Sequence, residues 1–387
     1  MMKIGVVGSG AMGSGIAQVA ATAGHEVLIY DNNPDALTRS KAQLAKIMAR
    51  LVEKGRLSEV EATSIQERIT YIDSVYNFRG VGLVIEAIVE RLDIKQAVFE
   101  QLEDVLGDEA ILATNTSSLP VAAIAAACQH PERVIGLHFF NPAPLMALVE
   151  VVPAVQTDNA IVDRCFDLMK TWKKVPVIAK DTPGFIVNRV ARPFYGEALR
   201  ILEEGLADAA TIDWIMTELG GFRMGPFTLM DYIGHDVNYK VTETVFAAFY
   251  YDPRYKPSFT QQRLVDAGYL GRKSGRGFYN YGEGQERPAP QQDHPRAQQL
   301  LHRILVMLIN EAADALYYNV ASRDDIDLAM TKGVNYPKGL LAWADELSIP
   351  YVVEQLDALH HEYLEDRYRC SPLLRRMMRE GRTFYEE

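Results

Sequence analysis

A turn with three glycines near the N-terminus is the first group of residues with an evident chemical use. Gly8, Gly10 and Gly13 follow the apolar run Ile4 to Val7, and Met12 lies within the same turn. Behind a strand, Gly8 permits a tight turn, Gly10 lets the backbone approach a pyrophosphate, and Gly13 allows the next helix to pack closely. The N-terminus of that helix supplies N–H donors for phosphate. The turn, Met12 included, therefore predicts a dinucleotide site.

An acidic residue completes this pattern. Asp31 follows a second apolar run, residues 27–30, where a second strand is expected to end. Its carboxylate would accept hydrogen bonds from the ribose hydroxyls and would repel a 2′-phosphate. Asn32 and Asn33 come next, with no adjacent arginine to bind that phosphate. These residues favour NAD over NADP as the cofactor.

Polar side chains also gather where later strands are expected to end. Ser117, His138 and Asn141 come at or just after the carboxyl ends of apolar runs, and Glu150 lies in the following run. In α/β folds such strand ends form ligand sites. A histidine titrates near neutral pH and can act as a general base, and a carboxylate on its second ring nitrogen would fix its tautomer. A structural, hydrogen-bonded histidine is the alternative for His138, and a helix N-cap is the alternative for Ser117.

The size and charge of the chain limit its class. A chain of 387 residues exceeds one ordinary core, so two or three domains are expected. The 51 acidic residues outnumber the 40 basic ones and give a net charge of -11. This balance argues against general binding to nucleic acid or to an anionic membrane. A phosphorylated ligand would need a local group of basic residues.

Several other kinds of protein are not expected. The first apolar segment is a strand interrupted by the glycine turn rather than a signal peptide, and no run reaches the ~20 apolar residues that span a bilayer. Cys128, Cys165 and Cys370 are too few and too scattered for a disulfide framework or a metal site. We therefore predict a cytoplasmic protein with no bound metal, no membrane partner and no nucleic-acid partner.

The apolar runs predict two architectures in one chain. Strand-like and helix-like runs alternate in the first part, which predicts an α/β, Rossmann-like domain over residues 1–182. Pro183 and Gly184 break the chain, and beyond them the apolar spacing is helical. The expected fold class is a Rossmann-like N-terminal domain followed by two tandem all-α domains.

The helical region repeats itself after 114 residues. The residues that this shift aligns include Arg189 with Arg303, Glu197 with Glu311, Ile212-Asp213 with Ile326-Asp327, Gly225 with Gly339 and Asp231 with Asp345. The duplication predicts a helical domain over residues 183–281, a linker rich in Gly, Pro and Gln over residues 282–294, and a second helical domain over residues 295–387. Asn188 is matched by His302, so we expect the first copy to carry the function.

Together these motifs resemble the L-3-hydroxyacyl-CoA dehydrogenase family over essentially the whole chain. The residues that carry the resemblance are Gly8 to Gly15, residues 84–87 with Glu90, Asn115 to Ser118, Gly136 to Pro142, Leu148 to Val151, Pro183 to Arg189, and Gly271 to Tyr279. The duplicated C-terminal region is similar to that of bacterial 3-hydroxybutyryl-CoA or 3-hydroxyadipyl-CoA dehydrogenases. The resemblance implies NAD-dependent oxidation of a short-chain 3-hydroxyacyl-CoA.

The resemblance also implies roles for the catalytic residues. His138 would take the proton of the substrate hydroxyl as hydride moves to NAD, and Glu150 would orient the imidazole and stabilise its charge. Ser117 would donate a hydrogen bond to the substrate beside the nicotinamide. Asn188 would hold the substrate and the catalytic histidine, and a side chain at a helix start is its alternative.

Further binding residues follow from the same resemblance. It assigns Glu90, Lys95, Asn141 and Lys273 to the cofactor site and Lys54 to the coenzyme A phosphates. For each of these lysines the alternative is a solvated surface position. The family usually has lysine where this chain has Ala147, which puts any ion pair assigned to that position in doubt.

Arg192 suggests how the distal end of a substrate could be recognised. If one helix begins near Pro183, Arg192 lies four residues beyond Asn188 and on the same face. It would then reach towards the end of the acyl group and favour a dicarboxylic chain such as 3-hydroxyadipyl. An arginine paired with a nearby acid such as Glu197, or simply solvated, is the alternative.

Two other functions stay open at this point. One is a relative that binds NAD or a ligand without turnover, and the other is a dehydrogenase of free 3-hydroxy acids, for which coenzyme A would be dispensable. In single-copy members of the family the helical domain pairs with its twin from a second subunit. We therefore predict an intrachain pseudo-dimer of the two helical domains, and a homo-oligomer of the whole chain stays open.

Overall fold

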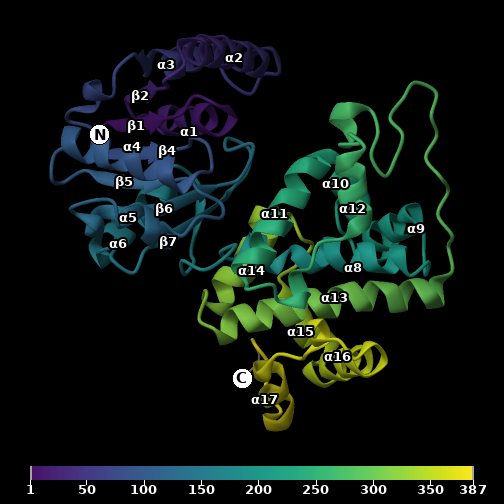
Figure 1. The fold of residues 1–387 in the computed structure, drawn as a ribbon. Helices are drawn as coiled ribbons and strands as arrows, with labels where there is room; N and C mark the ends of the chain where they lie inside the picture. The colour runs from purple at the N-terminus through teal and green to yellow at the C-terminus, as the bar shows by residue number, and fades with distance from the viewer. Residues whose placement is uncertain (1, 386–387) are drawn as a thin grey trace. The chain divides into compact units, whose positions relative to one another are not determined.

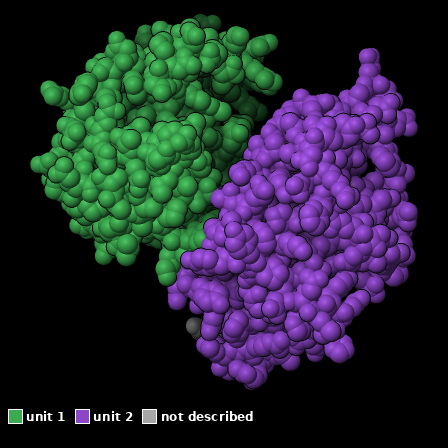
Figure 2. Space-filling model, in the orientation of Figure 1, with its two compact units in different colours: residues 1–185 green, residues 186–387 purple. Residues whose placement is uncertain are grey.

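Alternating strands and helices in the first half of the chain give way to helices in the second half (Figure 1). The computed structural model describes residues 2–385, and the chain divides into unit 1, residues 1–185, and unit 2, residues 186–387 (Figure 2). The predicted Rossmann-like N-terminal part and helical C-terminal part are confirmed. The division falls after Phe185 rather than residue 182, and the two predicted helical domains lie within unit 2 apart from residues 183–185.

An eight-stranded sheet forms the centre of unit 1. The strands are β1 (Ile4–Val7), β2 (Val27–Tyr30), β3 (Ile69–Ile72), β4 (Leu83–Glu86), β5 (Ile111–Thr114), β6 (Val134–Phe139), β7 (Leu148–Pro153) and β8 (Val175–Ile178). Their order is β3-β2-β1-β4-β5-β6-β7-β8. The pairing of β6 with β7 is antiparallel, and the other pairings in this sheet are parallel. Because the order reverses between β1 and β4, their carboxyl ends form the point where such sheets bind dinucleotides.

The helices of unit 1 follow from local signals in the sequence. They are α1 (Ala11–Thr22), α2 (Pro34–Glu53), α3 (Glu59–Glu67), α4 (Leu92–Val105), α5 (Val121–Ala125) and α6 (Asn159–Thr171), with short 3-10 turns at Val75–Phe78 and Pro131–Arg133. At the start of α2, Pro34 takes the first position and the Asn33 side chain accepts from Asp35 N at 3.0 Å. At the start of α3, Ser58 and Glu61 form a capping box.

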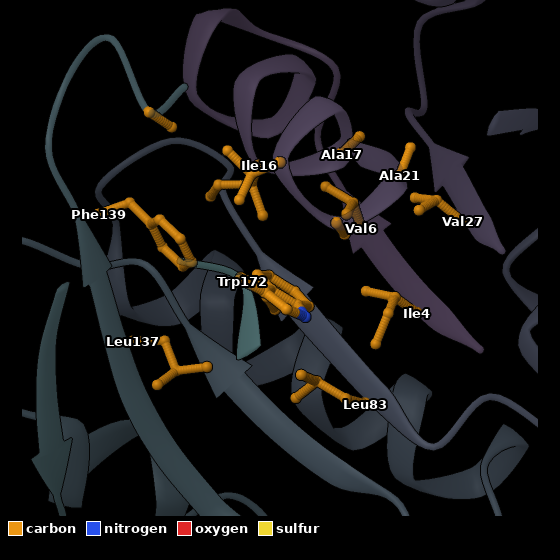
Figure 3. Close-up of a cluster of buried hydrophobic side chains, with 14 of the residues drawn as sticks. Ile4, Val6, Ile16, Ala17, Ala21, Val27, Leu83, Leu137, Phe139 and Trp172 are labelled. Atoms are coloured by element: carbon orange, nitrogen blue, oxygen red, sulfur yellow. The ribbon is translucent and has the colours of Figure 1, made fainter. Parts of the chain in front are cut away.

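The core of unit 1 determines which way the strand residues face. Leu137 and Phe139 of β6 point into a cluster with Trp172, Ile4 and Leu83 (Figure 3). The rings of Phe139 and Trp172 lie 6.3 Å apart. Full burial of each large apolar side chain is worth about 1.5–3 kcal/mol, and side chains alternate along a strand. His138, between Leu137 and Phe139, is therefore directed to the opposite face of the sheet.

Unit 2 is built from helices around a long central one. Its helices are α7 (Val187–Val190), α8 (Arg192–Glu203), α9 (Ala209–Trp214), α10 (Pro226–Ile233), α11 (His235–Ala248), α12 (Phe259–Asp266), α13 (His294–Tyr317), α14 (Arg323–Gly333), α15 (Leu340–Leu347), α16 (Ile349–Tyr363) and α17 (Pro372–Glu380). Single turns lie at Ile215–Leu219, Pro253–Tyr255, Arg272–Ser274 and Asp366–Tyr368. Helix α13 packs against α8 and against α15 and α16 (Figure 1).

The expectation of one helix through Asn188 and Arg192 is wrong. Helix α7 ends at Val190, and α8 begins at Arg192. Pro193 stands in the first turn of α8, where its missing N–H is tolerated, but it cannot continue a preceding helix because its ring meets the carbonyl four residues earlier. Asn188 and Arg192 therefore belong to two consecutive helices.

The same local contacts recur in the two helical segments. Asp213 accepts hydrogen bonds from Phe227 N at 2.9 Å and Tyr279 Oη at 2.8 Å. In the second segment Asp327 accepts from Leu341 N at 2.8 Å and Tyr385 Oη at 3.0 Å. Asp213 and Asp327 are aligned by the 114-residue shift, as are Phe227 and Leu341.

Buried ion pairs join the two segments reciprocally. Arg189 Nε lies 2.6 Å from Glu311 Oε1, and Arg303 Nε lies 3.1 Å from Glu197 Oε2. Two tyrosines repeat the exchange. Tyr255 donates to Glu311 at 2.5 Å, and Tyr368 donates to Glu197 at 3.0 Å. In each segment the arginine contacts the glutamate of the other segment. Such reciprocal contacts between equivalent residues are typical of a two-fold interface.

Candidate active site

His138 and Glu150 face each other across β6 and β7. They are directly opposite in the antiparallel register, and His138 Nδ1 lies 2.6 Å from Glu150 Oε2. Both side chains are buried, and the rings of Phe140 and Phe185 flank the imidazole at 4.5 and 5.8 Å. Since the carboxylate accepts, Nδ1 carries the proton, and Nε2 is the nitrogen that can take another.

The register of this strand pair follows from its apolar neighbours. On the core face Leu137 stands opposite Val151, and Phe139 stands opposite Val149. The residue between each apolar pair must point to the other face. A slip of one residue would turn the whole apolar set out of the core, so the same packing that stabilises the sheet holds His138 opposite Glu150.

Glu90 organises the loop that carries Ser117. It accepts hydrogen bonds from Thr116 Oγ1 at 2.5 Å, Ser117 N at 3.0 Å and Ser118 N at 3.2 Å. Burial opposes ionisation of Glu90, but the charge of Lys95 and these hydrogen bonds together lower its pKa. Helix α5 begins after Pro120 at its N-cap, so Ser117 does not cap it. The anion therefore fixes Ser117 at the end of β5.

Lys95 lies inside the protein rather than at a solvated surface. Its ammonium is 2.5 Å from Glu86 Oε1 and 3.3 Å from Glu90 Oε2. Glu86 is fully buried and also accepts from Thr114 Oγ1 at 2.8 Å and from Ile88 N at 2.7 Å. The sequence interpretation gave Glu86 no role, although an acid at the end of an otherwise apolar strand is a usable signal. Glu86 thus positions the ammonium group of Lys95, which in turn contacts the carboxylate of Glu90.

The glycine turn fits a dinucleotide. A Cβ at Gly13 would lie 1.9 Å from the carbonyl oxygen of Gly8, whereas a Cβ at Gly10 would meet nothing within 4 Å. Gly13 thus serves close packing of α1, and the backbone at Gly10 is open to a ligand. Asp31 Oδ2 accepts from Ser9 N at 2.8 Å and Ser9 Oγ at 2.9 Å. Ser9, which sequence reasoning passed over, therefore fixes the acid beside the turn.

A groove of about 920 Å³ in unit 1 brings several predicted residues together. Gly10, Asn141 and Lys54 all line it. Helix α2 and the residues after it add further basic side chains, Arg39, Lys46, Arg50 and Arg56. A concentration of cations in a chain of net charge -11 is the local feature that a phosphorylated ligand needs. Met12 lies apart from this lining and packs against the core of unit 1.

Lys174 supports the loop between β6 and β7. Its ammonium donates to Ala143 O at 2.5 Å and to Met146 O at 2.7 Å. That loop, residues 140–147, carries Asn141 and joins β6 to β7. Burial lowers the pKa of Lys174 to about 8. Sequence reasoning did not single out Lys174, because a lysine between a helix and a strand carries no visible sign of burial.

The remaining predicted site residues belong to unit 2. Asn188 lies in α7, Arg192 begins α8, and Lys273 lies in the turn Arg272–Ser274. The Lys273 ammonium is 2.5 Å from Asp236 Oδ1, and both side chains are partly exposed. Their roles toward the cofactor and substrate stay predictions.

The described residues contain neither a candidate membrane-spanning helix nor a candidate metal-binding group. Over residues 2–385, no helix combines the length and apolarity needed to cross a membrane. Over the same residues, no group of three or more His, Cys, Asp and Glu side chains is arranged to hold a metal ion.

Comparison with known proteins decides the family. The family model of the 3-hydroxyacyl-CoA dehydrogenase NAD binding domain matches residues 3–182, and that of the C-terminal domain of the same enzymes matches residues 184–281 and 300–385. The chain belongs to the 3-hydroxyacyl-CoA dehydrogenase family. The predicted cofactor, NAD, and the predicted class, an oxidoreductase acting on 3-hydroxyacyl-CoA, are thereby confirmed.

Individual relatives agree with this assignment. The chain is 38% identical to the 3-hydroxyadipyl-CoA dehydrogenase of Escherichia coli (strain K12), over 97% of each chain. It is also similar to the crystal structure of 3-hydroxybutyryl-CoA dehydrogenase from Escherichia coli K12, with a TM-score of 0.93, 38% identity, and 98% and 99% of the two chains covered. The crystal structure of (S)-3-hydroxybutyryl-CoA dehydrogenase from Ralstonia eutropha matches with a TM-score of 0.70 and 38% identity, over 73% of this chain and 100% of its own.

The burial of Lys174 gives a pH prediction. An unfolded lysine has a pKa of ~10.4, whereas burial lowers that of Lys174 to about 8. Between these pH values the unfolded chain binds more protons at Lys174 than the folded chain does. Lys174 therefore makes the free energy of unfolding increase as the pH rises. We expect the free energy of unfolding, measured in urea, to increase between pH 7.5 and pH 10 by about 1 kcal/mol more in wild type than in Lys174→Met, after allowance for solvent screening. Lys180→Met at an exposed position serves as the control. Equal pH slopes in wild type and Lys174→Met would contradict the assignment.

Proposed function

We propose that His138 is the general base in the oxidation of the substrate's 3-hydroxyl group. Its Nε2 takes the hydroxyl proton, and the C3 hydrogen leaves with its electron pair, so that the product is a 3-oxoacyl-CoA. NAD supplies the hydride acceptor when it is bound. The observation that carries the proposal is the 2.6 Å contact between His138 Nδ1 and Glu150.

The surroundings of the imidazole support this role. Glu150 is fully buried, so its negative charge acts on the imidazolium in a medium of low dielectric constant. The contact also fixes the tautomer, because only Nδ1–H can donate to the carboxylate. We assign Ser117 to hydrogen-bond donation toward the substrate oxygen and Asn188 to holding the substrate. The bonds that Glu90 makes to residues 116–118 support the placement of Ser117.

The same proposal assigns the cofactor residues. Gly8, Gly10 and Gly13, with the start of α1, would hold the pyrophosphate, and Asp31 would accept from the adenosine ribose. Met12, Glu90, Asn141 and Lys273 complete the assignment, and Lys95 acts through its contact with Glu90. Two observations support this assignment. The backbone at Gly10 is open to a ligand, and Asn141 lines the same groove as Gly10.

For the substrate we propose a short-chain acyl-CoA, either 3-hydroxybutyryl-CoA or 3-hydroxyadipyl-CoA. Both occur in the names of relatives that are 38% identical to this chain over nearly its full length. Lys54 would contact the coenzyme A phosphates. The four other basic residues that line the same groove support that assignment, because a phosphate is better neutralised by several cations than by one.

Substrate assays separate this function from its alternatives. The full chain with NAD and 3-hydroxybutyryl-CoA or 3-hydroxyadipyl-CoA should produce NADH, measured by its absorbance, and should prefer NAD to NADP. The free 3-hydroxy acids should give far lower kcat/KM because they lack the part of the substrate that the basic groove binds. A protein that binds NAD without turnover would instead be indicated by NAD affinity with no NADH from any of these compounds.

Substitution of the catalytic pair gives a second test. His138→Gln should lower kcat by at least ~10²-fold, the usual scale of general-base catalysis, with little change in the Kd for NAD. Glu150→Gln should also lower kcat and should change the pH profile of kcat, since the imidazolium loses its anionic partner. Arg164→Gln, at an exposed position of α6, serves as a control. Activity of His138→Gln within a few-fold of wild type would overturn the role of the base.

We also infer that the two helical segments form an intrachain pseudo-dimer. The reciprocal pairs Arg189–Glu311 and Arg303–Glu197 support it. Truncation after Tyr281 should expose the face of α8 that α13 covers and should remove Glu311 from Arg189 and Arg303 from Glu197, so self-association or aggregation is expected. Light scattering after size exclusion would measure the mass, with the full chain as reference. A monodisperse monomer of the truncated chain would argue against the pseudo-dimer.

A cytoplasmic location is proposed as well. Cys128, Cys165 and Cys370 are buried and unbridged, as is usual in a reducing compartment. Burial raises the pKa of each thiol to about 12, so the thiols stay protonated and unreactive near neutral pH.

A further inference from the structure

Arg192 is a buried cation without an anionic partner. The residue is 7% exposed, its guanidinium donates to Thr242 Oγ1 at 3.2 Å, and it lies 4.9 Å from the ring centre of Tyr195. Its Nε has no hydrogen-bond partner within residues 2–385, and no carboxylate in that range offsets its charge. Burial lowers the pKa of Arg192. A buried charge is normally paired, since leaving it unpaired is strongly destabilising.

A second unpaired polar group lies close by. The Tyr336 hydroxyl is buried and has no hydrogen-bond partner within the described chain. The tyrosine lies close enough to Arg192 to influence its pKa, and its ring packs against those of Phe194 and Phe222. Arg192 offers an N–H donor from α8, and Tyr336 offers an O–H donor from the turn before α15. Neither donor has an acceptor among residues 2–385.

The repeat inside unit 2 shows that the fold itself does not require these polar groups. The 114-residue shift that aligns Arg189 with Arg303 also aligns Arg192 with Val306 and Phe222 with Tyr336. Val306 and Phe222 are both buried and apolar. The Arg192–Tyr336 pair takes one residue from each segment, and the 114-residue shift relates it to the apolar pair Val306–Phe222. The arginine of this pair begins α8, directly after α7, the helix that carries Asn188.

We infer that Arg192, with the Tyr336 hydroxyl, binds the distal carboxylate of a dicarboxylic 3-hydroxyacyl-CoA. The inference rests on the proposed function, in which Asn188 holds the reacting end of the acyl group. A guanidinium binds a carboxylate through two parallel N–H donors, and a phenol can donate a third hydrogen bond. The ligand would thus supply the anion that the protein lacks. This deepens the proposed function by assigning the substrate class to a specific pair of side chains.

The test compares two substrates of equal chain length. 3-Hydroxyadipyl-CoA carries the distal carboxylate, and 3-hydroxyhexanoyl-CoA ends in a methyl group. For wild type, kcat/KM should be higher for the dicarboxylic substrate. In Arg192→Val, which copies the residue at position 306, the ratio of the two kcat/KM values should fall by at least ~10²-fold, the scale for loss of one partner of a buried charge pair. In Tyr336→Phe, which copies position 222, the ratio should fall several-fold.

Controls separate failure of the inference from failure of the proposed function. Arg200→Leu removes the same charge from the same helix, where Arg200 lies 3.8 Å from Glu197, and should leave the substrate ratio unchanged. If wild type oxidises both substrates with NAD but Arg192→Val and Tyr336→Phe keep the wild-type ratio, the inference is overturned while the dehydrogenase function stands. If Arg192→Val does not fold, an unchanged ratio in Tyr336→Phe overturns it instead. Absence of NADH from every acyl-CoA would refute the proposed function itself.

Discussion

The antiparallel pairing of β6 with β7 is the constraint on which the placement of the proposed catalytic pair depends. In a sheet of otherwise parallel strands, this reversal puts His138 and Glu150 directly opposite each other. Their separation of 2.6 Å requires no long-range adjustment, because Leu137, Phe139 and Val151 fix the register by packing into the core. Stability and function thus rest on the same set of apolar contacts.

In unit 1, the charged side chains of Glu86, Glu90, Lys95 and Lys174 are held by one another or by hydrogen bonds to nearby groups. Lys95 bridges Glu86 and Glu90, Glu90 gathers the N–H and O–H groups of residues 116–118, and Lys174 secures two carbonyls of the loop after β6. Such contacts are strong where water is excluded. They leave few unpaired charges behind the site and fix the loops from which a cofactor would be bound. Preorganisation of this kind reduces the reorganisation that a reaction requires.

Unit 2 uses one structural pattern twice but with different chemistry in each half. Asp213 and Asp327 make the same capping contacts, and the glutamates of the two long helices exchange arginine partners. The two halves differ at aligned positions in and after α7. Asn188 is aligned with His302, and Arg192 is aligned with Val306. A recurring packing pattern can hold apolar side chains at one position and polar side chains at the aligned position. This explains how an unpaired buried arginine can coexist with an otherwise well-paired interior.

The sequence alone determined the fold class and located the glycine turn, Asp31, and His138 and Glu150 as candidate site residues, because these features are local or repeat with the period of a strand or helix. It also indicated the 114-residue repeat, since aligned residue types are visible without coordinates. Tertiary structure decided what depends on contacts between distant segments: the contacts of Glu86, the burial of Lys95 and Lys174, and the lack of an acid beside Arg192 among residues 2–385. The break between α7 and α8 likewise required the backbone. The residue type gives the charge of a side chain, but contacts with residues distant in the sequence decide whether that charge is solvated, paired or isolated.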